Sequence, residues 1–257
     1  NPAFINLESR NGLGWLEGFN EMVVRCGYEW TGHPVTADGQ LYTLHGKAGN
    51  TPASQVSVDV SEKAPYEIRI RGLVKESTFK KADLQTEMEL RYIPGSNSFS
   101  LHDVLTNHAD YPHDYQIIYH SNFSKPILEE GARFITPLES VSPFNDYAKG
   151  GMKTWQTYAG PTKGFDEMVL NIKPLADANK QTVAALLNKA GDKGVAIDYN
   201  TDQLPVLTLW KNTDTEKQGY VTGIEPGTSY AYPVTIEREQ KRVKQLQAGQ
   251  STRFDLT

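Results

Sequence analysis

The sequence predicts an all-β protein, built as a large sandwich or barrel. Short runs in which apolar and polar residues alternate recur along the chain at spacings of roughly ten residues. Glycine, proline, asparagine and aspartate separate these runs, which is typical of strands joined by turns. Only one stretch, residues 179–194, also has apolar residues at helical offsets. We expect it to be a strand that ends at Asn188, then a turn and the next strand.

Each strand is predicted from alternation within its own run. In the clearest run, Val56, Val58 and Val60 fall on one face of a strand. The segments 29–40 and 124–165 are long and rich in turn-forming residues, so we expect loops there. The runs that predict strands are 55–60, 66–72, 84–93, 98–107, 114–123, 166–172, 194–200, 204–212, 219–226 and 232–240.

Composition narrows the class of partner. The net charge is −5, and acidic and basic residues are interleaved without a basic stripe. A nucleic-acid-binding surface would need such a stripe, so we expect no nucleic acid partner. No apolar run approaches the roughly 18 residues that span a bilayer, so we expect no membrane partner either. Composition therefore indicates neither of these two classes of partner.

The chain length and cysteine content favour one cytoplasmic domain. A length of 257 residues suits one large all-β domain or two small ones, and no linker divides residues 1–257. We therefore predict a single domain. Cys26 is the only cysteine, so no internal disulfide can form, which favours a reducing compartment. A signal peptide is not recognisable at Asn1.

Several common kinds of site have no motif in this sequence. The six histidines do not show zinc-site spacing, and a cysteine pair is impossible. Phosphate-binding glycine loops of the two common patterns are absent, as is the G-x-S-x-G nucleophile elbow. What remains is a set of histidines and carboxylates next to aromatic residues.

Five residues of this set stand at strand positions suited to proton transfer. His120 lies in the apolar run IIYHSNF, where a histidine is either a hydrogen-bonded core residue or a proton carrier. His45 precedes a glycine at a strand end. Glu225 follows an apolar stretch, so it is either a desolvated base or an acceptor for the next amides. Asp166 and Glu167 begin a strand, and one of the two must face inward.

Aromatic residues interleave with these candidates. An aromatic face beside fixed polar groups suits a sugar ring, which has apolar C–H faces and a rim of hydroxyls, but it suits a sandwich core equally well. The aromatic residues concerned are Trp15, Trp30, Tyr119, Trp155, Trp210, Tyr220 and Tyr230.

Five segments in order resemble one family. They are CGY at 26–28, LHGKAGN at 44–50, IYHSNFS at 118–124, WKN at 210–212 and GYVTGIEP at 219–226. Together they resemble the aldose 1-epimerase, or galactose mutarotase-like, superfamily, and within it the DUF4432 branch. The resemblance runs from about residue 12 to the C-terminus. It implies a large β-supersandwich with a sugar site in a groove across one sheet.

The resemblance also implies roles for individual residues. His120 matches the general acid that protonates the ring oxygen, and Glu225 matches the base that takes the proton from the anomeric hydroxyl. The expected substrate-binding residues are His45, Asp166, Arg25, Trp210 and Lys211. Arg25 does not stand in the arginine motif of the mutarotases, so a structural or surface role is an equal alternative. Lys47 stands where this branch usually has arginine.

The chemistry that the resemblance implies needs no metal or cofactor. One base and one acid on opposite sides of the ring open the hemiacetal, and each contributes about 10²–10⁴-fold. We therefore predict a cofactor-independent carbohydrate epimerase. Two alternatives stay open: a carbohydrate-binding protein without turnover, and a lyase or isomerase acting on a modified or acidic sugar.

The resemblance further implies strands before the region matched here. Without them, either the sandwich is shorter or a partner completes an edge. An unpaired edge strand would favour a homodimer.

Overall fold

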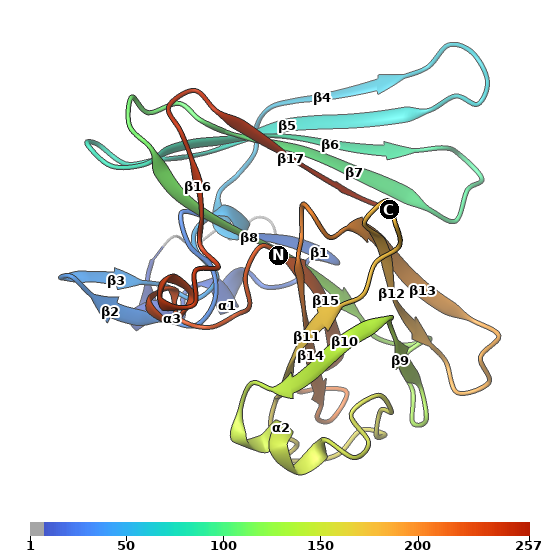
Figure 1. The fold of residues 1–257 in the computed structure, drawn as a ribbon. Coiled ribbons are helices and arrows are strands. Elements are labelled where there is room, and N and C mark those ends of the chain that lie inside the picture. The colour runs from blue at the N-terminus through green and yellow to red at the C-terminus, as the bar shows by residue number, and fades with distance from the viewer. Residues whose placement is uncertain (1–7) are drawn as a thin grey trace. The chain divides into compact units, whose positions relative to one another are not determined.

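The structure, a computed structural model, describes residues 8–257 and consists mainly of strands (Figure 1). Its chain divides into two compact units. Unit 1 holds described residues 8–20, 25–118 and 231–257, and unit 2 holds 21–24 and 119–230. The chain thus passes from one unit to the other within a strand, between Ile118 and Tyr119. The single domain expected from the sequence stays a prediction.

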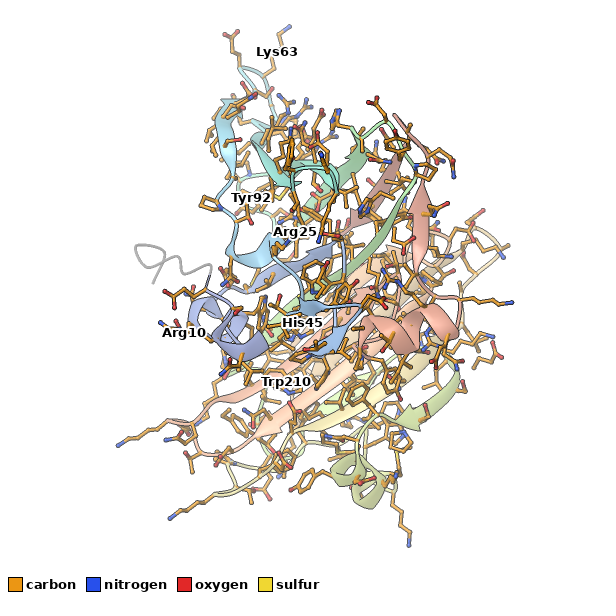
Figure 2. The ribbon with its side chains drawn as sticks, turned by 90° about the vertical axis from the view of Figure 1, so that its left-hand side faces the viewer. Arg10, Arg25, His45, Lys63, Tyr92 and Trp210 are labelled. Atoms are coloured by element: carbon orange, nitrogen blue, oxygen red, sulfur yellow. The ribbon has the colours of Figure 1, made fainter. Side chains whose placement is uncertain are left out.

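An antiparallel sheet forms most of unit 1. Its strands pair in the order β4 (Ser54–Val60), β5 (Ile68–Ser77), β6 (Asp83–Tyr92), β7 (Phe99–Asn107) and β17 (Ser251–Leu256). Lys63 marks the tip of the β4–β5 hairpin in Figure 2. One face of this sheet carries fully buried Leu84, Leu105 and Phe254, which form part of the core of the unit. Burial of such side chains is the main favourable term in folding.

Shorter elements complete unit 1. They include β1 (Val23–Tyr28), which starts in unit 2, and the first part of β8 (His113–Phe123), which pairs with β16 (Lys244–Leu246). The others are η1 (Arg10–Gly12), α1 (Trp15–Gly18), β2 (Val35–Ala37), β3 (Gln40–Tyr42), η2 (Ala48–Asn50) and α3 (Val234–Glu239). Within residues 8–257, no helix has the length and apolar character needed to cross a bilayer.

Unit 2 contains the strands that carry most of the candidate residues. The end of β8 lies next to β15 (Tyr220–Gly227), followed by β14 (Val206–Thr213), β11 (Met168–Pro174) and β10 (Leu138–Pro143). A second set pairs in the order β13 (Gly194–Asn200), β12 (Gln181–Leu187) and β9 (Arg133–Ile135). The helix α2 (Asp146–Gly151) follows β10. Most side chains of β11, β14 and β15 are buried on both faces of the sheet.

Most predicted strands are confirmed. The hairpin expected in 179–194 is formed by β12 and β13, which pair from Gln181↔Asn200 to Leu187↔Gly194. The expected loops contain short elements, namely β2 and the start of β3 in 29–40, and β9, β10 and α2 in 124–165.

The strand predicted for 232–240 is wrong, because these residues form α3. Pro233 precedes the helix, and its carbonyl accepts the amides of Ile236 and Glu237. Val234 and Glu237, three positions apart, are both buried, and Glu237 binds Arg242 with Nε and Oε2 2.6 Å apart. Proline at a helix start is a helix signal, but over so few residues helical spacing and alternation are hard to distinguish.

The alternating valines of β4 do lie in a strand but are not buried. β4 is the edge of its sheet in unit 1, and Val56, Val58 and Val60 are each about 60% exposed. Alternation therefore predicted the strand correctly, while burial of its apolar face depends on what covers an edge.

We expect the two apolar positions Val58 and Leu105 to differ sharply in their effect on stability. Val58→Ala should change the free energy of unfolding by less than about 0.5 kcal/mol, because its side chain is exposed. Leu105→Ala should lower it by about 2–5 kcal/mol, because Leu105 is fully buried and would leave a cavity. Urea denaturation measures both changes. Similar losses from the two variants would contradict this description of β4.

Candidate functional site

His120 is buried near the end of β8, in the part of this strand that belongs to unit 2. Every residue from Tyr115 to Ser121 of β8 is buried, and His120 itself is 5% exposed. The strand is covered on both faces, which is why the sequence reads there as an almost continuous apolar run. A histidine buried in such a run needs a polar partner for its imidazole ring, because a buried polar group without a partner is costly.

Glu225 on β15 is the polar residue next to the His120 ring. Its Oε1 lies 3.2 Å from Nε2 of His120, and its side chain is 2% exposed. Gly223 makes this approach possible, because a Cβ added there would come within 2.4 Å of Glu225 Oε1 and 3.1 Å of His120 Cε1. The glycine is thus required by space rather than by its backbone angles.

Trp210 and Glu167 complete the surroundings of this pair. The β14–β15 register places Trp210 opposite Gly223 and Thr208 opposite Glu225. The indole ring of Trp210 meets the His120 ring edge to face, with centroids 5.6 Å apart. Its Nε1 donates a hydrogen bond to Oε2 of Glu167 at 3.1 Å. Four side chains from four strands or their ends therefore form one buried or half-buried cluster: His120, Glu225, Trp210 and Glu167.

The structure does not bring Asp166 to this cluster. Asp166 is exposed, and its Oδ1 accepts the backbone amide of Glu167 at 2.8 Å. Glu167 instead bonds Trp210, so it is the carboxylate that faces the site. The sequence required one member of this pair to face inward, and that member is Glu167; the role of Asp166 as a sugar contact stays a prediction.

Burial moves the pKa values of the pair in opposite directions. It lowers the pKa of His120 to about 4, since a charged imidazole would lose its hydration. The same desolvation raises the pKa of Glu225 well above its usual range, and the negative charge of Glu167 raises it further. Burial therefore disfavours the charged form of each group, the imidazolium of His120 and the carboxylate of Glu225.

Lys211 does not belong to this cluster. Neighbouring residues on a strand point to opposite faces, so Lys211 lies on the face of β14 away from Trp210. Its Nζ donates hydrogen bonds to the carbonyls of Trp155 and Thr157, at 2.9 and 2.8 Å. Joining Trp210 and Lys211 in one substrate groove, as the sequence analysis did, is therefore not supported by the geometry.

The two remaining candidates, Arg25 and His45, belong to unit 1, where Figure 2 labels them. Arg25 binds fully buried Asp103 through two hydrogen bonds, Nε–Oδ2 at 2.5 Å and Nη2–Oδ1 at 3.0 Å. This geometry supports the structural alternative for Arg25. His45 is buried with its ring 4.7 Å from that of Trp15, and its role as a sugar contact stays a prediction.

Lys47, the other departure from the family pattern, also makes contacts within unit 1. Its Nζ lies 3.7 Å from carboxylate oxygens of both Glu29 and Glu76, and 4.7 Å from the Trp30 ring centroid.

Sequence reasoning missed Glu167 and Gly223 as parts of the site. Glu167 could have been found from strand alternation, because it lies two positions before Val169, which pairs with Trp210, and therefore on the same face as the indole. Gly223 gave no signal, because a glycine inside a strand does not reveal which side chains approach it.

The fold is that of the galactose mutarotase-like proteins. A galactose mutarotase-like protein from Clostridium acetobutylicum superposes with a TM-score of 0.60 at 13% identity, over 91% of this chain and 78% of that one. A structure from Escherichia coli K12 superposes with a TM-score of 0.56 at 14% identity, over 88% of this chain and 77% of the other. These similarities confirm the large all-β sandwich fold predicted from the sequence.

The chain belongs to the family described as "Domain of unknown function (DUF4432)", whose model matches residues 1–257. A protein from Klebsiella pneumoniae shares 84% identity and superposes with a TM-score of 0.97 over all of this chain and 67% of that chain. It and the Escherichia coli protein are each described as a "putative aldose 1-epimerase". A search of curated proteins found no match.

We expect Gly223→Ala to push the Glu225 carboxylate away from His120. A methyl group at this position has no free space, so the free energy of unfolding should fall by about 1–3 kcal/mol. Urea denaturation measures the loss, and NMR of the His120 ring reports the broken contact. Gly150→Ala is the matched control, because a Cβ there meets no atom within 4 Å and should be neutral or slightly stabilising. Equal behaviour of the two variants would contradict the proposed packing.

Proposed function

We propose that this protein is a cofactor-independent epimerase that interconverts the anomers of an aldose or a related sugar. The observation that carries the proposal is the buried contact between His120 and Glu225, 3.2 Å apart and shifted in pKa in opposite directions. Oppositely shifted pairs of this kind are the usual basis for assigning an acid and a base. The names given to the Klebsiella pneumoniae and Escherichia coli proteins support the same general kind of activity.

The pair can carry out both proton transfers of the reaction, because it accepts one proton from the sugar and donates one to it. The base removes the proton from the hydroxyl oxygen O1 while the acid protonates the ring oxygen O5. The C1–O5 bond then breaks, O1 becomes the carbonyl oxygen of an open-chain aldehyde, and rotation about C1–C2 presents its other face. Closing the ring reverses both proton transfers. The pair returns to its starting state with one proton, so no other reactant is needed.

The geometry changes one feature of the mechanism expected from the sequence. There, the acid and the base were expected on opposite sides of the sugar ring. His120 and Glu225 instead touch, and this suits the reaction because O1 and O5 are both bonded to C1. Burial favours neutral His120 with protonated Glu225, while transfer of the proton gives the assignment that the resemblance implies. Each arrangement contains one acid and one base.

Trp210 and Glu167 have supporting roles in this proposal. The indole ring beside His120 offers an apolar surface to the C–H face of a sugar. Glu167 holds the indole through its Nε1 and keeps a negative charge near Glu225. It therefore takes the place that the sequence analysis gave to Asp166.

We expect His120→Asn and Glu225→Gln each to lower the rate of anomer exchange by about 10²–10⁴-fold, because each removes one of the two proton-transfer groups. NMR saturation-exchange experiments on a panel of free aldoses and uronic acids measure this rate. The double variant should lose little more than either single variant, since the two residues act as one unit.

The outcomes separate the alternatives. Exchange no faster than in buffer for every sugar, in a folded protein, would contradict an epimerase. Sugar binding without exchange would identify a carbohydrate-binding protein. Incorporation of solvent deuterium at a carbon atom of the sugar would identify the lyase or isomerase alternative, because such an enzyme removes a carbon-bound proton.

We expect a bell-shaped dependence of kcat/KM on pH. Below about 4, His120 gains a proton and the pair has no base left. Above the raised pKa of Glu225, the pair loses its only proton and has no acid left. Glu167→Gln removes a charge that raises the pKa of Glu225, so it should move the alkaline limb to lower pH. Steady-state kinetics from pH 3 to 11 measure both limbs (about the range in which these groups titrate).

Asp166→Asn is the matched control for this experiment. It neutralises the neighbouring carboxylate, which is exposed and lies outside the cluster, so the alkaline limb should stay in place. Equal shifts in the two variants, or none in Glu167→Gln, would contradict the role of Glu167.

A further inference from the structure

A cavity lies in unit 2, on the face of β14 opposite the His120–Glu225 pair. Its volume is about 740 Å³, which is within the range of sites for small organic ligands. The walls are largely aromatic and apolar, with Tyr147, Tyr158, Phe165 and Met168 among the lining residues. The cavity also contains one cation, the ammonium group of Lys211.

Lys211 is a buried cation without a counter-anion. Its side chain is 4% exposed, and within residues 8–257 no carboxylate forms an ion pair with it. Two of its three N–H donors bond the carbonyls of Trp155 and Thr157, and the Tyr158 ring lies 4.4 Å from Nζ. Asp146, the carboxylate at the cavity wall, is paired with Lys149 and exposed. A buried charge is costly unless it is paired, so this position is suited to an incoming anion.

The chemistry of the cavity indicates which anion. One lysine with one remaining N–H can satisfy a single carboxylate, whereas a phosphate group normally needs several donors or cations. The aromatic walls offer apolar contact to the rest of the ligand. We propose that this cavity is a second ligand site, which binds a small carboxylate with an aromatic or apolar body through Lys211.

A purely structural role explains less of what is observed. Two carbonyls and an aromatic ring do stabilise an ammonium group, but an apolar residue at this position would fill the space without any cost of desolvation. Burial lowers the pKa of Lys211 to about 8, so the side chain remains mostly charged at neutral pH and available to an anion. A structural role would not require this charge to lie at the wall of an open cavity, where Lys211 does lie.

Benzoate and phenylacetate, each compared with its neutral amide, test the proposal. We expect both carboxylates to bind the full chain at least tenfold more tightly than benzamide and phenylacetamide, by calorimetry (about 1.4 kcal/mol). NMR of the methionine methyl groups locates the ligand, because Met168 lines the cavity while Met22 and Met88 do not. Carboxylate should shift the Met168 signal alone among these three.

Substitutions then assign the preference to Lys211. Lys211→Met should remove the preference for the carboxylate, while Lys173→Met, at an exposed lysine paired with Glu139, should leave it unchanged. Tyr147→Ala, at the wall, should weaken the acid and the amide by the same factor, and it keeps the test valid if Lys211→Met does not fold. His120→Asn should bind normally, which separates this site from the proposed epimerase.

Three results would overturn the proposal. The first is equal binding of acid and amide, and the second is binding that leaves the Met168 signal in place. The third is the absence of any carboxylate that binds more tightly than about 1 mM.

Discussion

The contact between His120 and Glu225 depends on their shared burial. Each side chain alone would be an isolated polar group inside a covered sheet, and each would be costly there. Burial disfavours the charged form of each, so the pair is least costly when both groups are neutral. The space for this contact comes from Gly223, and its surroundings come from Trp210 and Glu167. Much of the local sequence of β8, β14 and β15 is therefore constrained by two atoms 3.2 Å apart.

The sheet uses strand alternation to keep two different environments apart. On one face of β14, Trp210 borders the His120–Glu225 pair. On the other face, the next residue, Lys211, lies at the wall of a cavity. One face thus carries carboxyl groups and the other an ammonium group, although the two residues of β14 that face them, Trp210 and Lys211, are adjacent in sequence. The backbone hydrogen bonds of β14 to β11 and β15 maintain this separation.

The sequence allowed most of the fold to be predicted, because alternation and turn residues act locally. The strand β8 and the hairpin of β12 and β13 are examples. The helix α3 was missed because six residues are too few for helical spacing to differ clearly from alternation. The exposure of Val58 was also missed, since burial at a sheet edge depends on residues distant in sequence.

The site was predictable in part for the same reason. His120 and Glu225 stand in apolar runs, so their burial follows from the local sequence. The resemblance of the chain to one family predicted that both belong to the same site. Their distance of 3.2 Å depends on strand order and register, which local patterns do not contain. The choice between Asp166 and Glu167, and the separation of Lys211 from Trp210, both depend on which face a residue takes. A shift of one position reverses that assignment.

This dependence on position makes β14 far more sensitive to length than to composition. One residue inserted before Trp210, with the rest of the strand keeping its pairing, would exchange the two faces. The indole would enter the cavity, and the ammonium group would move to the face of the sheet that carries His120 and Glu225, where a positive charge favours the ionised carboxylate. A substitution in this strand changes the environment on one face only, whereas the insertion of one residue would change the environments on both faces at once.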